Sequence, residues 1–185
     1  RFAGETAPLP SLGSQAVPTP PAVRSHDSLL EVRGLTKRYG STVVCNDVSL
    51  TIRRGEILGL VGESGSGKTT LARCIAGLVQ PTSGSIALEG ASLHPKLGRR
   101  SGNMLRSIQM VFQNPDSTLN PSHTVRYVLA RAIRKLQGVW SVDDLALEVS
   151  LGARQLEQRT TQLSGGEKQR AAIGRAIAGT PQVVL

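Results

Sequence analysis

The stretch GESGSGKTT, residues 62–70, decides the fold of this chain. It satisfies the pattern G-x-x-x-x-G-K-[ST], in which glycines let backbone N–H groups wrap closely around a phosphate chain. Lys68 is then predicted to reach the β- and γ-phosphates of a nucleotide, and the Thr69 hydroxyl to hold Mg²⁺. The residues predicted to bind the nucleotide in this loop are Gly62, Glu63, Ser64, Gly65, Ser66, Gly67, Lys68, Thr69 and Thr70.

The segments on either side of the loop favour a strand before it and a helix after it. EILGLVG, residues 56–62, is a short apolar run bounded by glycine, which predicts a strand buried on both faces of a parallel sheet. The apolar positions after Gly67 follow the i, i+3, i+4, i+7 spacing of one helical face, at Leu71, Cys74, Ile75 and Leu78. The N-terminus of that helix is predicted to point its partial positive charge at the phosphates.

Upstream of the loop, the composition changes near residue 28. Residues 1–27 hold five of the ten prolines, so we expect a linker or tail that cannot bury enough apolar surface to fold. The chain opens on Arg1, which indicates that something normally precedes it. Residues 29–33 and 48–52 then read as an antiparallel hairpin that ends before a turn at residues 53–55.

Two further helices are predicted downstream of the loop. Residues 125–136 carry one apolar stripe opposed by basic residues, which is typical of an amphipathic helix. A second helix is predicted to start at Ser141, with Asp144 completing a capping box, and to end at Gly152. Core packing is the default interpretation of these stripes, and no site is assigned to them.

Composition excludes several classes of protein. The chain has 185 residues, 39% of them apolar, and no run approaches the ~18 apolar residues of a membrane-spanning helix. A signal peptide pattern is also missing, so we expect a cytosolic chain. Cys45 and Cys74 are predicted to be reduced and buried. The net charge of +9 is spread along the chain without aromatic residues between, which favours a solvated surface and no nucleic-acid partner.

The second informative stretch is QLSGGEKQR, residues 162–170, where Ser164, Gly165 and Gly166 precede an apolar helical pattern. A serine and two glycines at a helix N-terminus predict a second anion site. The same residues also fit an ordinary cap, because Glu167 stands three positions after Ser164 in a capping box. Both interpretations can hold at once.

Together, GESGSGKT and LSGGEKQR resemble the nucleotide-binding subunit of ABC transporters, where the second motif is the family signature. The resemblance implies an α/β P-loop NTPase fold with a mixed core sheet, an antiparallel β subdomain and a helical insertion subdomain. We expect the domain to span residues 28–185, with the helical subdomain at about 115–178. It also implies a head-to-tail dimer in which each ATP lies between the loop around Lys68 of one domain and Ser164, Gly165 and Gly166 of the other.

Two more positions match the family. Tyr39, in KRYG, stands where the family places an aromatic ring against adenine. Gln113, in MVFQNP, matches the glutamine that contacts Mg²⁺ and the attacking water and senses the transmembrane partner. The resemblance therefore implies Lys68 and Gln113 as catalytic residues, Thr69 and Gln113 as metal ligands, and ATP with Mg²⁺ as the bound species.

The stretch FQNPDSTLNP, residues 112–121, is similar to the same region in importers of dipeptides, oligopeptides and nickel. Thr160, Thr161 and Gln162 depart from the subfamily pattern ahead of the signature. Import of di- or oligopeptides is the favoured function, with nickel import and a soluble ABC-type ATPase of translation or DNA repair as alternatives. The implied partners are permease subunits, a substrate-binding protein and a second nucleotide-binding domain, which the proline-rich linker suggests lies in the same chain. The implied location is the cytoplasmic face of the membrane.

The last residues, AGTPQVVL, read as a turn followed by the opening of a buried parallel strand. In the family such a strand runs into an Asp-Glu pair that supports Mg²⁺ and polarises the attacking water. Neither acid is present by Leu185. We therefore expect these 185 residues alone to bind nucleotide weakly, to be poorly stable, and not to hydrolyse ATP at a family-like rate.

Overall fold

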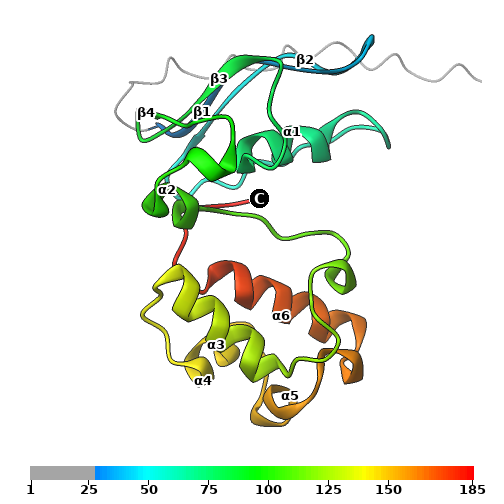
Figure 1. Ribbon diagram of the computed structural model, residues 1–185, viewed down its shortest axis with the longest axis vertical. Coiled ribbons are helices and arrows are strands. Elements are labelled where there is room, and N and C mark those ends of the chain that lie inside the picture. Colours follow the sequence, from blue (N-terminus) through cyan, green and yellow to red (C-terminus); the bar gives the residue numbers. More distant parts are fainter. Residues whose placement is uncertain (1–27) are drawn as a thin grey trace, which may run out of the picture.

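The computed structural model describes residues 28–185, and the predicted linker over residues 1–27 lies outside them. Two groups of elements are stacked along the long axis of the molecule in Figure 1. The sheet group holds an antiparallel sheet and helix α1 (Lys68–Ala76), and the helical group holds helices α3 (Val125–Leu136) to α6 (Gly165–Ile177). Each group has its own cluster of buried apolar side chains, the first built around Leu30, Leu35 and Cys74, and the second around Leu129 and Leu145.

The sheet begins with the predicted hairpin, which is confirmed. Strands β1 (Ser28–Tyr39) and β2 (Thr42–Arg53) pair antiparallel, and both are longer than the sequence pattern indicates. Strands β3 (Ser83–Leu88) and β4 (Ala91–Ser92) extend the sheet in the order β2-β1-β3-β4. The buried side chains of β1, at Leu29, Leu30, Val32 and Leu35, belong to the first core.

Helix α1 (Lys68–Ala76) follows the phosphate-loop motif, as predicted. Its buried side chains include Leu71, Cys74 and Ile75, while Leu78 falls after the helix end and is 46% exposed, contrary to the predicted stripe. The helix stops because Gly77 adopts the left-handed conformation, with φ of 77°. Cys45 and Cys74 are free and buried, and burial raises the pKa of both thiols, as expected of inert cysteines.

The predicted strand over residues 56–62 is wrong for this structure. Those residues carry no strand hydrogen bonding, and Ile57 and Val61 are 97% and 98% exposed. A strand of this kind needs neighbours on both edges to pair its backbone groups. Among residues 28–185, the parallel pairing that does form joins β5 (Ile108–Gln109) to β6 (Val183–Val184), and it confirms the strand opening predicted for the last residues.

The connection between β4 and β5 contains η1 (Leu97–Arg99) and α2 (Gly102–Ser107). After β5 come η2 (Pro115–Ser117), α3 (Val125–Leu136), α4 (Val142–Glu148), α5 (Ala153–Glu157), η3 (Thr160–Gln162) and α6 (Gly165–Ile177). Helix α3 and the Ser141 cap of α4 are confirmed. The predicted helix end at Gly152 is wrong, because α4 ends at Glu148 and Gly152 instead precedes α5 as its N-cap. None of the helices in the described part of the chain has the length and apolar character that crossing a membrane requires.

Candidate nucleotide-binding site

Glycines shape the loop of residues 62–67. Gly65 and Gly67 have φ angles of 85° and 90°, in the left-handed region that favours glycine. A β-carbon on Gly67 would lie 2.4 Å from the carbonyl oxygen of Val44 in strand β2, and one on Gly62 would lie 2.9 Å from Ser66 Oγ. The loop therefore passes against the hairpin with its backbone exposed for contact with a ligand.

The ammonium group of Lys68 lies in the concavity of this loop. Its Nζ donates to the carbonyl oxygens of Gly62 at 2.7 Å and Glu63 at 2.6 Å, and to Ser66 Oγ at 3.0 Å. A hollow of about 270 Å³ opens here, lined by the loop and by β2. A phosphate oxygen entering the loop would exchange with these carbonyl acceptors and receive a charge-assisted hydrogen bond.

The start of α1 supplies further donors. The first backbone bond within the helix runs from Leu71 N to Gly67 O at 2.8 Å, which leaves the amides of Lys68, Thr69 and Thr70 without helical partners. The cap residue Gly67 has no side chain to satisfy them, and the first turn holds no acidic residue. Together with the helix dipole, these amides form an anion-binding end. The Thr69 side chain is exposed at the same end.

Tyr39 lies at the tip of the hairpin that touches the loop. Its ring is 51% exposed, as a base-stacking side chain must be. Lys37 Nζ lies 4.6 Å from the ring centroid, a cation–π contact that places positive charge over one face of the ring. The hairpin contacts the loop at Val44, five residues from Tyr39, so the Tyr39 ring and this contact lie at the same end of the hairpin.

The second motif forms the capping box predicted for it. Ser164 is the N-cap of α6, and its Oγ accepts from the backbone N–H of Glu167 at 3.3 Å and donates to that carboxylate at 2.8 Å. The Ser164 amide and the Gln155 side-chain amide also donate to the carboxylate. These bonds, the backbone one foremost, lower the pKa of Glu167 to about 2. The exposed amides of Gly165 and Gly166 are the donors that the box leaves for an anion.

Gln113 is exposed and lies between the two groups of elements. Two residues before it, Val111 N donates to Leu185 O at 2.8 Å, beside the β5–β6 pair. One residue after it, Asn114 caps η2. Within residues 28–185, neither the Gln113 side chain nor the Thr69 hydroxyl is held by a hydrogen bond to the protein.

The two predicted phosphate-binding loops are not brought together within one chain. The loop before α1 belongs to the sheet group, whereas the start of α6 belongs to the helical group, on the other side of the segment that carries Gln113 (Figure 1). Each loop therefore presents donors without completing a closed site by itself.

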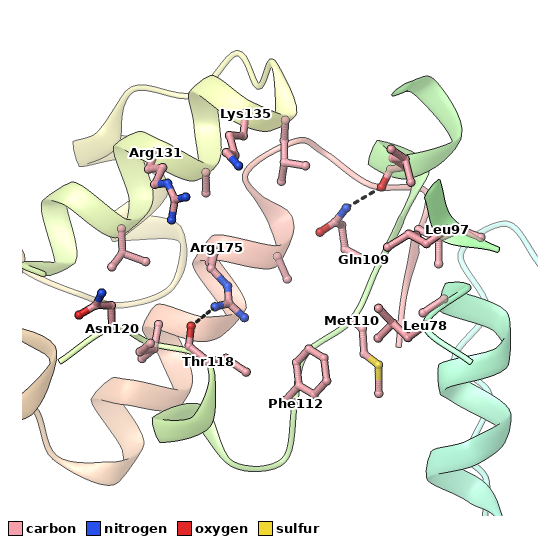
Figure 2. A pocket seen from close by; sticks show the side chains of 18 of the residues that line it. Leu78, Leu97, Gln109, Met110, Phe112, Thr118, Asn120, Arg131, Lys135 and Arg175 are labelled. Atoms are coloured by element: carbon pink, nitrogen blue, oxygen red, sulfur yellow. Dashed lines mark hydrogen bonds between the residues drawn. The ribbon is translucent and has the colours of Figure 1, made fainter. Parts of the chain in front are cut away.

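Sequence patterns did not indicate a hollow of about 510 Å³ between the two groups, shown in Figure 2. Arg131 and Lys135 of α3 line it, and so does Arg175 of α6, whose Nη1 donates to Thr118 O at 2.6 Å. The i, i+4 spacing of Arg131 and Lys135 puts both on one helical face, and this was the available signal. A stripe of this kind gives no reason by itself to predict a site, since core packing is the default interpretation.

Comparison with known proteins identifies relatives of the whole described region. The family model described as ABC transporter matches residues 45–185. The nickel import ATP-binding protein NikE of Shigella boydii serotype 4 is 39% identical, over 85% of this chain and 65% of that protein. The oligopeptide transport ATP-binding protein OppF of Lactococcus lactis subsp. lactis is 38% identical, over 82% of this chain and 50% of that protein. The chain thus spans between half and two thirds of the length of these curated relatives.

Among solved structures, the chain is similar to a dimeric ATP-binding cassette in a post-hydrolysis state bound to ADP and Pi. The TM-score is 0.69 at 30% sequence identity, and the match covers 84% of this chain and 72% of that one. This likeness confirms the predicted α/β fold of the P-loop NTPase type.

Proposed function

Because this chain belongs to the ABC transporter ATP-binding family, we propose that the full-length protein binds and hydrolyses ATP to drive import across a membrane. ATP would bind at the loop around Lys68, with Tyr39 against the adenine ring. The relatives named above are both ATP-binding proteins of import or transport systems, which supports this reading.

One observation carries the proposal: the chain presents two anion-binding helix starts on separate groups of elements. The amides of Lys68, Thr69 and Thr70 belong to the sheet group, and the signature amides of Gly165 and Gly166 belong to the helical group. Two such half-sites are completed when a second nucleotide-binding domain packs head to tail, so that each ATP is held between them. The similar structure named as dimeric and bound to ADP and Pi supports this arrangement.

The residues present fit Mg²⁺ as the companion of ATP. The exposed Thr69 hydroxyl and the Gln113 side-chain oxygen are hard oxygen donors of the kind that Mg²⁺ accepts alongside phosphate. When bound, Mg²⁺ supplies charge neutralisation at the β- and γ-phosphates. The chain's own contribution is positioning: Lys68 and the loop amides bind and neutralise the phosphates, and Gln113 orients the attacking water. Ser164 reaches the γ-phosphate by turning its hydroxyl proton away from Glu167.

For the cargo, we propose di- or oligopeptides, on the strength of the paired Asn-Pro units in residues 112–121. Nickel is the second candidate, because the nickel import protein matches at 39% identity. The proposed partners are permease subunits, a substrate-binding protein and a second nucleotide-binding domain, on the cytoplasmic face of a membrane.

The test uses the full-length protein, purified with its permease and placed in vesicles. Hydrolysis of Mg²⁺-ATP is measured for the wild type and for Lys68→Ala, whose loss of the ammonium group is expected to lower turnover by at least about 100-fold. Unchanged turnover in that variant contradicts the assignment of Lys68.

Cargo is tested in the same vesicles by ATP-dependent uptake of a labelled dipeptide, a labelled pentapeptide and Ni²⁺. Uptake of either peptide supports the proposal, and uptake of Ni²⁺ alone selects the second candidate. Hydrolysis by a protein that copurifies with ribosomes or DNA, and with no membrane subunit, selects the soluble alternative.

A further inference from the structure

The residues directly after Gln113 form a compact turn, residues 114–119. Asn114 Oδ1 accepts from the Asp116 amide at 3.0 Å, and the Ser117 hydroxyl donates to Asn114 O at 2.8 Å. The Leu119 amide donates to Pro115 O at 2.9 Å, and the Leu119 side chain is buried in the helical core. These bonds hold the turn together, and Gln113 is the residue directly before it.

Helix α6 holds this turn at two points. Lys168 Nζ lies 2.7 Å from Asp116 Oδ1, and Arg175 Nη1 donates to Thr118 O at 2.6 Å, a contact visible in Figure 2. Positions 168 and 175 are seven residues apart, about two helical turns, and therefore share one face of α6. Lys168 is also one turn from Ser164, the residue that leads the signature helix.

On its other side, Gln113 is anchored to the sheet group. Val111 N donates to Leu185 O at 2.8 Å, and Leu185 N donates to Gln109 O at 2.9 Å. Gln113 thus lies between a backbone anchor two residues upstream and a side-chain anchor three residues downstream. The downstream anchor is the ion pair between Asp116 and Lys168. Lys168 belongs to α6, the helix that starts at the second motif.

We propose that Asp116, through its ion pair with Lys168, is a positioning residue that fixes Gln113 relative to the N-terminus of α6. The inference rests on the proposed function, since it takes Gln113 and Ser164 both to act on bound ATP. In a head-to-tail dimer the two residues face different nucleotides. The ion pair therefore links the signature loop that holds one ATP to the glutamine that serves the other.

The exposure of the Asp116–Lys168 ion pair determines how large a change in turnover its removal can cause. Asp116 is 65% exposed and Lys168 is 19% exposed, so the ion pair is screened and its loss does not unfold the helical group. An interaction of this class supports a change in turnover of about two- to fivefold. Arg175 is less suitable for a test, because it is more buried and removing it leaves a backbone carbonyl without its donor.

The experiment compares full-length Asp116→Asn and Lys168→Gln with the double variant Asp116→Lys/Lys168→Asp. We expect each single variant to lower kcat for ATP about two- to fivefold, with an unchanged Kd for ATP and an unchanged Tm. The double variant restores the pair with reversed charges and is expected to return kcat to within about twofold of the wild type.

The matched control is Asp143→Asn. Asp143 pairs with Arg126 at 3.2 Å within the helical group, and Arg126 keeps its partner Glu157 at 2.6 Å. This control neutralises a carboxylate of similar exposure, 68% for Asp143 against 65% for Asp116, without touching the turn, so its kcat is expected to match that of the wild type.

Wild-type kcat in Asp116→Asn overturns the inference, as does a single-variant loss that the charge reversal fails to restore. A fall in Tm shared by Asp116→Asn and Asp143→Asn also overturns it, because it indicates a purely structural role. These outcomes leave the proposed function intact if hydrolysis still depends on Lys68. If the wild type shows no Lys68-dependent hydrolysis, the proposed function is wrong and this inference falls with it.

Discussion

Gly67 faces the backbone of Val44 so closely that a β-carbon on Gly67 would lie 2.4 Å from the Val44 carbonyl oxygen. Gly67 also has a φ of 90°, which residues with side chains rarely adopt. Two independent constraints, one local and one from a strand 23 residues away in the chain, therefore require glycine at the point where the loop enters α1.

Gly67→Ala is expected to lower the free energy of unfolding by at least about 2 kcal/mol, because the positive φ and the contact with a rigid backbone oxygen both oppose the new methyl group. Nucleotide affinity is expected to fall with it, since the loop must move away from β2. The control is Gly55→Ala, where φ is 71° but no atom lies within 4 Å of the added carbon. Chemical denaturation checks both variants, and equal losses would contradict the role of Val44.

Thr69 is predicted to act through its hydroxyl at the start of α1. Thr69→Ala is expected to raise the Mg²⁺ concentration for half-maximal ATP hydrolysis by at least about tenfold, because one oxygen ligand is lost. Thr69→Ser keeps the oxygen, so its Mg²⁺ concentration for half-maximal hydrolysis is expected to stay close to that of the wild type. A Mg²⁺ titration of the full-length protein decides, and an identical midpoint in Thr69→Ala would rule out the ligand role.

Glu167 makes stability depend on pH through the capping box of α6. Its pKa is about 2 in the folded chain against an ordinary 4.5, first because of the Ser164 backbone bond. A lowered pKa stabilises the fold above pH 4.5, and this stabilisation is lost as the pH falls through about 2. The difference in unfolding free energy between the wild type and Glu167→Gln is therefore expected to be largest above pH 5 and to vanish near pH 2. A difference that stays constant over this range in urea melts would refute the assignment.

Arg100 is predicted to fasten α1 to the segment that follows β4. Its side chain is buried, with Nη1 donating to Ile75 O and Nε to His94 O, each at 2.9 Å. Burial lowers the pKa of the guanidinium, which still donates both bonds. Arg100→Leu leaves both carbonyls unpaired and is expected to cost about 2–4 kcal/mol of stability. The control is Arg99→Leu at the exposed neighbouring residue. Its free energy of unfolding is expected to stay within about 0.5 kcal/mol of the wild-type value.

The structural features that the sequence predicted correctly depend on residues close together in the chain. The cap of α6 at Ser164 needs a carboxylate three positions later, which Glu167 supplies. Such features follow from backbone geometry that a few residues fix by themselves. The amphipathic helix over Val125–Leu136 was predictable for the same reason, because its period is local.

Other features depend on partners that no local pattern names. Residues 56–62 read as a buried strand, yet they remain exposed because a strand forms only when other strands supply its hydrogen bonds. The end of the helix begun at Ser141 was misplaced because Gly152 signals a break without showing whether a helix ends or starts there.

The sequence by itself therefore determined the two glycine-containing motifs, their place at helix starts and the family, since these depend on the spacing of neighbouring residues. Only the tertiary structure decided that the two motifs belong to different groups of elements. It also showed that Lys168 reaches Asp116 and that Arg175 reaches Thr118, across 52 and 57 positions of the chain. Contacts at such separations arise from packing, because the helical core fixes which side chains of α6 face the turn after Gln113.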